Sequence, residues 1–340
     1  YTFMKTGANR RMRKIIIVLL LCCLAFSGSG WVAGGGNPVY AATTVYEAED
    51  GTLGGSPLPQ INSDHPGYSG TGFVAYFNQD GQFFTITANV ATAGIYKVIM
   101  RYASDYGAVR SILVNGSAQF GAISFPAPGN GGSWDAWADS EPVYVHLNAG
   151  SNTITVKHDS AKGSTGSANF DYFKIEETGE PYAPYNGTSV SLPGTVQAED
   201  YNTGGSGIAY SDTTSGNTGG TYRTDDVDIQ TTSDSGNGYN VAWTDDGEWL
   251  KYNVRTDTTA NFNMDIRVAN AFEANAAVKV YIDGQYKGKF AVPVTGDYQT
   301  WTTIQGPRGI RLHAGVHAVK LEIVTGNFNV NWMEFTTFGS

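Results

Sequence analysis

Cysteine is almost absent from this 340-residue sequence: only Cys22 and Cys23 occur, and both lie within the first 42 residues. The rest of the chain has no thiol for a disulfide, a zinc cluster or a nucleophile. The five histidines are scattered without metal-ligand spacing. No arrangement of Ser, His and Asp for nucleophilic catalysis can be argued from their positions. The sequence therefore indicates neither a zinc site nor a hydrolase triad.

Long apolar runs are also missing, with one exception near the N-terminus. Four basic residues within 10–14 precede the apolar run 15–26, and a stretch of small residues then leads to Ala41 and Ala42. This order is typical of a secretory signal cleaved near those alanines. A membrane anchor is disfavoured because the run has about a dozen residues, whereas a spanning helix needs roughly 20. We therefore expect residues 1–42 to be a signal peptide, and the mature protein to be secreted to the extracellular space, free of the membrane.

Positive charge is scarce in the part that would remain. Without the five basic residues of the signal region, 16 Lys and Arg stand against 31 Asp and Glu, a net charge of −15. A surface this acidic disfavours nucleic acid and anionic lipid, because their phosphates require basic patches. The many carboxylates suit Ca²⁺ outside the cell instead.

What the sequence does contain is one pattern that occurs twice. The order of the matching points is kept while the loop lengths between them differ, which indicates a tandem repeat of one domain. The offsets run from 150 to 167 residues over four matched pairs, which are Glu49 and Glu199, Tyr76 and Trp243, Trp134 and Tyr298, and Asp171 and Asn331.

Two units, 44–177 and 195–338, are therefore predicted, joined by a linker over 178–194 that contains Pro, Gly and Ser. Within each unit, short runs alternate apolar and polar residues, as half-buried strands do. The clearest runs are 96–102, 143–147, 152–156, 263–268, 277–282 and 318–323. Turn signals such as Asn115-Gly116 and Asp283-Gly284 separate them. The predicted fold class is all-β, with two tandem antiparallel β-sandwiches of the jelly-roll kind.

The start of each unit places two oxygen-bearing side chains on one face of a strand, because alternate residues of a strand share a face. Two close carboxylates repel unless a cation or a proton lies between them. The last strand adds a third oxygen, and backbone carbonyls can complete the six to eight ligands that Ca²⁺ prefers. The residues concerned are Glu47, Glu49 and Asp171 in the first unit and Gln197, Glu199 and Asn331 in the second.

Two other interpretations of these oxygens stay open. One is a solvated strand edge. The other is an acid and base pair of the glycosidase kind, which is disfavoured because both oxygens come from one strand and nothing faces them across a cleft.

Aromatic residues form the second group of candidates. Trp243 lies where a strand enters a turn, and Tyr298 lies in a loop after Thr-Gly-Asp. Aromatics at such positions can form a platform for the apolar face of a sugar ring, with each stacked ring contributing about 1–2 kcal/mol. An amide such as Asn329 would then fix the orientation of the sugar through its hydroxyls. A core position is the default expectation for the other tryptophans considered, which are Trp137, Trp249, Trp301 and Trp332.

The acidic run 245–248 resembles a catalytic cluster at first sight. Its three acids point to different faces, however, and its Asp-Gly pair lies between two strand-like segments. We therefore interpret the run as a hairpin turn.

Several spaced motifs resemble known families of sugar-binding domain. In the second unit, the motifs at 193–201, 222–229, 238–252 and 328–335 resemble carbohydrate-binding module family 6. In the first unit, those at 46–51, 67–76 and 168–173 resemble the related family 35. The resemblance implies a β-sandwich with a structural calcium and a sugar cleft in the loops at one end.

The resemblance also implies roles for individual residues. The cleft falls on Trp243, Tyr298 and Asn329 in the second unit and on Tyr76, Trp134 and Asn169 in the first. The calcium ligands fall on the six residues named above. Two positions depart from the family pattern: Asn331 stands where aspartate is common, which lowers the ligand charge, and Tyr298 stands where tryptophan is common, which shrinks one platform.

We therefore expect a secreted, monomeric, non-catalytic protein whose partner is a polysaccharide or oligosaccharide. Such modules normally accompany a glycoside hydrolase or lyase. The residues before Met4, and an end directly after the second unit, suggest a targeting fragment with an appended catalytic domain. The alternatives are a cell-surface or matrix adhesin that recognises glycans and, less favoured, a glycan-degrading enzyme, for which the sequence offers no pair of opposed carboxylates.

Overall fold

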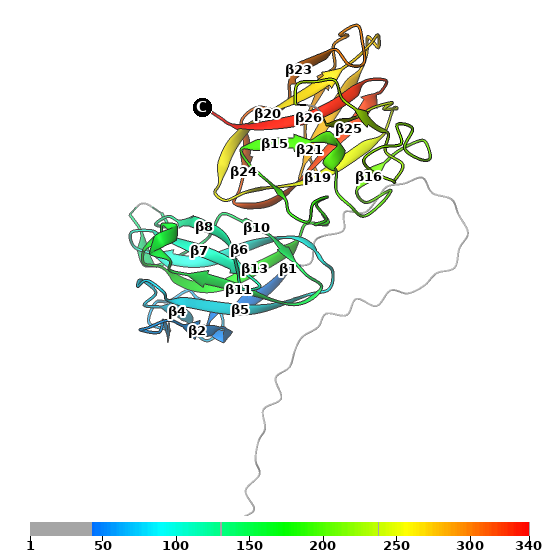
Figure 1. Ribbon diagram of the computed structural model, residues 1–340. Coiled ribbons are helices and arrows are strands. Elements are labelled where there is room, and N and C mark those ends of the chain that lie inside the picture. The colour runs from blue at the N-terminus through cyan, green and yellow to red at the C-terminus, as the bar shows by residue number, and fades with distance from the viewer. Residues whose placement is uncertain (1–42, 130, 237, 340) are drawn as a thin grey trace, which may run out of the picture. The chain divides into compact units, whose positions relative to one another are not determined.

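The computed structural model describes residues 43–129, 131–236 and 238–339, and the predicted signal peptide lies outside them (Figure 1). The described residues form strands and three single-turn 3₁₀ helices, η1 (Ala48–Asp50), η2 (Ser160–Lys162) and η3 (Ala198–Asp200). None of the helices in this part of the chain is long and apolar enough to span a membrane. The predicted all-β class is confirmed.

The first unit is a sandwich of two sheets whose internal strand pairs are antiparallel. One sheet contains β1 (Thr43–Glu47), β3 (Gln60–Asn62), β4 (Phe73–Ala75), β6 (Gly94–Ser104), β9 (Ser133–Asp139), β10 (Val143–Leu147) and β13 (Asn169–Glu177). The other contains β2 (Thr52–Gly54), β5 (Phe83–Val90), β7 (Ala108–Val114), β8 (Ser117–Phe125), β11 (Gly150–Lys157) and β12 (Thr165–Gly166).

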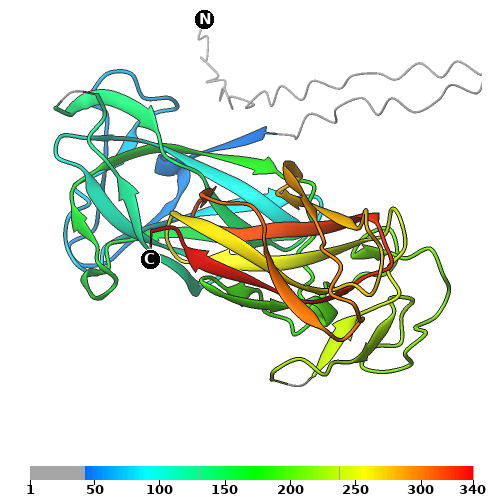
Figure 2. The same cartoon turned by 90° about the horizontal axis from the view of Figure 1, so that it is seen from above.

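The second unit repeats this plan, and its strands, green to red in Figure 2, form two sheets. One sheet contains β15 (Gly194–Gln197), β17 (Ile229–Thr231), β18 (Tyr239–Val241), β20 (Ala260–Ala269), β23 (Trp301–Gln305), β24 (Ile310–Leu312) and β26 (Asn329–Thr337). The other contains β14 (Val190–Ser191), β16 (Tyr210–Ser211), β19 (Trp249–Thr256), β21 (Ala277–Ile282), β22 (Gln285–Ala291) and β25 (Gly315–Thr325). Strand β14 falls within the predicted linker and pairs in parallel with β19.

The alternating runs of the sequence become strands because one face of each is buried. Strands β10 and β21 have the predicted bounds, and the other four predicted runs lie inside β6, β11, β20 and β25. The turns Asn115-Gly116 and Asp283-Gly284 join the hairpins β7–β8 and β21–β22. All four turn residues have positive φ, which Asn, Asp and Gly adopt more readily than other residues.

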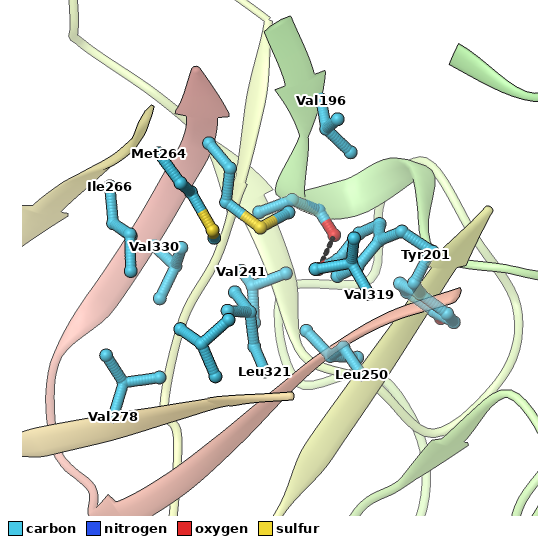
Figure 3. Packing of buried hydrophobic residues seen from close by; sticks show 14 of the residues in the cluster. Val196, Tyr201, Val241, Leu250, Met264, Ile266, Val278, Val319, Leu321 and Val330 are labelled. Atoms are coloured by element: carbon cyan, nitrogen blue, oxygen red, sulfur yellow. Dashed lines mark hydrogen bonds between the residues drawn. The ribbon is translucent and has the colours of Figure 1, made fainter. Parts of the chain in front are cut away.

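The core of each sandwich fills the space between its sheets. In the first unit, the ring of Phe170 contacts those of Phe84 and Phe125, with centroids 5.4 and 5.0 Å apart. In the second, aliphatic side chains and Met264 dominate, as Figure 3 shows around Val241, Leu321 and Val330. Full burial of each such side chain contributes about 1.5–3 kcal/mol.

Two expectations are wrong. None of the four tryptophans assigned to the core is fully buried, because each takes an outward position on its strand; Trp332, for example, precedes the buried Met333. The run 245–248 forms a turn but not a hairpin, because it connects β18 in one sheet to β19 in the other. Glu248 folds back there to accept hydrogen bonds from the backbone of Thr213 and Asp245, each 2.9 Å long.

Candidate functional site

Trp243 lies two residues after the end of β18, where the backbone leaves the sheet. Its φ is 48°, a left-handed conformation that bulky residues rarely adopt and that costs about 1–3 kcal/mol. The neighbouring Thr244 holds this turn, since its hydroxyl donates to the carbonyl of Phe328 over 2.7 Å. The indole remains 48% exposed. The strained backbone conformation at Trp243 therefore keeps its indole ring exposed to solvent.

Tyr298 and Asn329 lie beside Trp243 and are fixed to each other. The Asn329 amide donates to the carbonyl of Tyr298 over 2.7 Å, and the phenol of Tyr298 donates to Oδ1 of Asn327 over 2.6 Å. Asn329 is buried at the start of β26, so its position is set by the sheet.

These side chains line a pocket of about 180 Å³ in the second unit. Its walls are Gln230, Ala242, Trp243, Tyr298, Asn327 and Asn329. The three cleft residues expected from the sequence thus come together, whereas Gln230 and Asn327 were missed. Asn327 also has positive φ, 64°, and follows a glycine, a signal of a turn that alone does not identify a binding residue.

The first unit carries a corresponding pocket of about 280 Å³. Tyr76 follows β4 as Trp243 follows β18, with φ of 54° and 56% exposure. Trp134 and Asn169 line the same pocket, so the three expected residues again come together. The remaining walls are Asn62, Asp64, His65, Ala75, Asn78 and Ser167.

His65 was not expected at this site. Its Nδ1 lies 2.7 Å from Oδ1 of Asp135, and its ring centroid lies 6.3 Å from that of Trp134. A lone histidine in a loop gives no sequence signal for such a position, because its partner is 70 residues away in the chain.

Strand register makes the two pockets equivalent beyond the aromatic residues. Val74 pairs with Ile61 in the first unit, and the matching Val241 pairs with Ile229 in the second. The next residues, Asn62 and Gln230, are therefore counterparts, and each puts an amide into its pocket wall. An aromatic face with two amides can hold the apolar face and the hydroxyls of a sugar.

The expected calcium ligands of the first unit gather around Ser69. Its hydroxyl donates to Glu47 over 2.7 Å and lies 3.2 Å from Asp171, while Glu49 accepts from the backbone of Thr71 over 2.7 Å. Burial raises the pKa of Glu47, and Glu49 and Asp171 raise it further by repulsion. Oε2 of Glu49 is buried without a hydrogen-bond partner.

The positive charge of Arg101 offsets part of the negative charge of the three carboxylates in the first unit. Its Nε lies 3.3 Å from Oδ2 of Asp171, which is otherwise buried and without a hydrogen bond. The sequence reasoning missed this cation.

The second unit arranges its expected ligands differently. Glu199 is buried, burial raises its pKa to about 7, and its Oε2 has no hydrogen-bond partner. The amide of Asn331 donates instead to Oδ2 of Asp234 over 2.9 Å, and Arg267 holds that aspartate through two bonds of 2.7 and 2.8 Å. Gln197 is exposed at the end of β15.

Within the ranges that the structure describes, no three His, Cys, Asp or Glu side chains are grouped so as to hold a metal ion by themselves. Glu49 and Glu199 occupy matching positions after β1 and β15, and each has a buried oxygen without a hydrogen-bond partner. These oxygens fit a bound cation, because burying an unpaired carboxylate costs free energy that a cation would offset.

Two known families of sugar-binding domain match the chain, one in each unit. Residues 44–178 match the carbohydrate binding module (family 35), and residues 219–337 match the carbohydrate binding module (family 6). A family 35 module from Clostridium thermocellum of known structure is 28% identical; the match covers 40% of this chain and 98% of that one, with a TM-score of 0.35.

Two curated relatives are enzymes that are much longer than this chain. A 1,6-alpha-glucosyltransferase of Sporosarcina globispora is 30% identical over 310 residues, which is 88% of this chain and 21% of the enzyme. An exo-beta-D-glucosaminidase of Amycolatopsis orientalis is 36% identical over 144 residues, which is 40% of this chain and 13% of the enzyme. The described chain therefore consists of two carbohydrate-binding modules in tandem, the first of family 35 and the second of family 6.

Proposed function

We propose that the protein binds a polysaccharide without cleaving it, through one aromatic-lined pocket in each module. The observation that carries the proposal is that both modules contain the same arrangement of residues, which includes a strained backbone conformation. In both modules an exposed aromatic with positive φ, Tyr76 or Trp243, lies beside a buried asparagine, Asn169 or Asn329. Strained backbone persists where the fold holds it in place, and it is concentrated at functional sites.

An α-glucan with 1,6-linkages is the ligand class that we propose. The match to the 1,6-alpha-glucosyltransferase runs through both modules, whereas that to the exo-beta-D-glucosaminidase covers 144 residues. Because the part of this enzyme that matches the chain includes both modules, we infer that both modules bind the glucan on which such an enzyme would act. Two weak sites on one chain gain affinity through their effective concentration.

The composition of the pockets supports a non-catalytic role. Among the described residues, the walls of the second pocket include no carboxylate, and those of the first include only Asp64. Glycoside hydrolysis normally uses two carboxyl groups about 5–10 Å apart. We propose that the chain targets itself, or a catalytic domain to which it is joined, to the glucan.

Two further properties belong to this proposal. The signal-like residues 1–42 support secretion. Calcium at Glu49 and Glu199 would neutralise the two orphaned carboxylates and stabilise the ends of β1 and β15, with Glu47, Asp171, Gln197 and Asn331 as neighbouring oxygen donors. Its role would be structural.

Affinity electrophoresis tests the proposal. The mature chain, with calcium, is run through gels that contain dextran, pullulan, starch, xylan, mannan or a β-glucan, and release of reducing sugar is assayed in parallel. We expect retardation in dextran without sugar release. Retardation by a β-linked glycan alone would contradict the proposed ligand class, and released sugar would contradict the non-catalytic role.

A matched pair of variants links retardation to the pocket. Trp243→Ala removes the platform of the second module and should weaken retardation. Phe338→Ala removes an aromatic that is 57% exposed but lies at the other end of β20, where its N–H donates to Asn261. Retardation of this control should equal that of the unmutated chain.

A further inference from the structure

The two most exposed large hydrophobic side chains of the described residues are aromatic, and they occupy matching loops. Tyr106 is 91% exposed in the loop from β6 to β7. Phe272 is 66% exposed in the loop from β20 to β21. The pocket walls considered so far include neither of them.

Strand register shows that the two positions are equivalent. In each module an alanine lies opposite the pocket asparagine, and the exposed aromatic is the third residue after that alanine. The opposed pairs are Ala103 with Asn169 and Ala269 with Asn329. Both aromatics therefore lie where the chain leaves the strand next to the pocket.

Buried polar side chains hold both loops, so the exposure does not come from a loose segment. Asn270 is fully buried, donates to the carbonyl of Glu273 over 2.7 Å, and accepts from the N–H groups of Phe272 and Glu273. Its counterpart Ser104 accepts from the N–H of Gly107 over 2.9 Å. Each anchor fixes a loop whose aromatic side chain faces water.

Contacts connect both loops to the pockets. The ring of Phe272 meets that of Tyr298 edge-on, with centroids 5.8 Å apart and planes at 70°. In the first module, the hydroxyl of Ser104 donates to the carbonyl of the wall residue Ser167 over 2.6 Å. Phe272 thus continues the surface that begins inside the second pocket, and Tyr106 lies in a loop that is tied to the wall of the first.

The size of the second pocket limits what it can hold. Its volume of about 180 Å³ is below the roughly 300–1,000 Å³ of sites that enclose a drug-sized ligand, so it suits about one sugar ring. A longer oligosaccharide must leave the pocket over its rim. On the side of Tyr298, the exposed ring of Phe272 lies next to the pocket wall.

We propose that Phe272, and Tyr106 at the equivalent position, stacks against a second sugar ring of the bound oligosaccharide. This inference rests on the proposed function, because it extends the same pocket by one subsite. It makes affinity depend on the length of the oligosaccharide, since a single sugar in the pocket does not reach Phe272 and a longer chain does. The loops thereby set how many sugar units each module recognises.

Titration by NMR with ligands of two lengths tests the proposal. Full-length chains carrying Tyr76→Ala, which silences the first pocket, are titrated with methyl α-glucoside and with isomaltotriose. We expect Phe272→Ala to weaken isomaltotriose about 3- to 10-fold, the range of one aromatic stacking contact, and to change methyl α-glucoside less than about twofold. Phe272→Trp should restore the affinity for isomaltotriose, and Phe338→Ala should alter neither.

The outcomes separate this inference from the proposed function. If Phe272→Ala binds both ligands as the unmutated pocket does, or loses affinity for both equally, Phe272 is not a subsite; equal loss would mean that it only supports Tyr298. If the chain with an intact Phe272 binds neither ligand, the proposed α-glucan function itself is refuted, and this extension with it.

Discussion

The amide of Asn329 donates a 2.7 Å hydrogen bond to the backbone carbonyl of Tyr298, which ties the first residue of β26 to the loop before β23. Within the described residues, no hydrogen bond to Oδ1 of Asn329 is formed, so that oxygen is available to accept from a sugar hydroxyl. One buried side chain therefore both shapes the pocket and presents a polar group to it.

Replacing Asn329 should affect binding and stability together. Asn329→Ala leaves the carbonyl of Tyr298 without its partner, so we expect the free energy of unfolding to fall by about 1–3 kcal/mol. Affinity for dextran should fall at least about tenfold as well. Denaturant unfolding and affinity electrophoresis measure the two effects, and unchanged binding by a folded variant would remove Asn329 from the site.

Removing the ring at the strained positions should cost binding but not stability. Trp243→Gly relieves a positive φ that glycine adopts freely, and the lost indole is half exposed. We expect the melting temperature to stay within a few degrees of its original value, while retardation by dextran weakens. Tyr76→Gly is the matching change in the first module. A large fall in melting temperature would show that the ring at 243 belongs to the core instead.

Chelation should destabilise the protein if calcium lies at the orphaned carboxylates. With excess EGTA we expect a lower melting temperature, restored by Ca²⁺. Glu199→Gln should reduce this response in the second module, because it removes the charge that a cation would neutralise. An identical melting temperature with EGTA and with Ca²⁺ would argue against a structural metal.

The pH dependence of the metal-free protein follows from Glu199. Its pKa in the folded state is about 7, raised by burial above the ordinary 4.5, so the folded state holds a proton that the unfolded state releases between these values. The free energy of unfolding should therefore fall as pH rises from about 4.5 to about 7, by up to roughly 3 kcal/mol. Glu199→Gln in EGTA should flatten this slope; an equal slope in both proteins would assign it to other groups.

Much of the fold could be predicted because its signals are local. Alternating runs located strands such as β10 and β21, and Asn-Gly and Asp-Gly marked two hairpins. The turn after β18 was wrongly interpreted as a hairpin because that prediction relied on a local signal alone. An Asp-Gly pair reports a tight turn, whereas the sheet that the next strand joins is decided by partners far away in the chain.

The site was predicted in part. The repeat and the family resemblance located Trp243, Tyr298 and Asn329, which the structure brings to one pocket. Asn327 and Phe272 were missed, because an amide or an aromatic in a loop has the same local pattern whether it faces a pocket or bulk water. The register of β20 against β26 was required to find Phe272.

The central claim is that both pockets bind one glucan, and a double variant tests it most directly. Isothermal titration with an isomalto-oligosaccharide long enough to span both modules compares the unmutated chain with Tyr76→Ala, Trp243→Ala and the double variant. We predict that each single variant keeps weakened binding, with a stoichiometry of one remaining site, and that the double variant binds nothing while melting at the original temperature. Undiminished binding by the folded double variant would contradict the account.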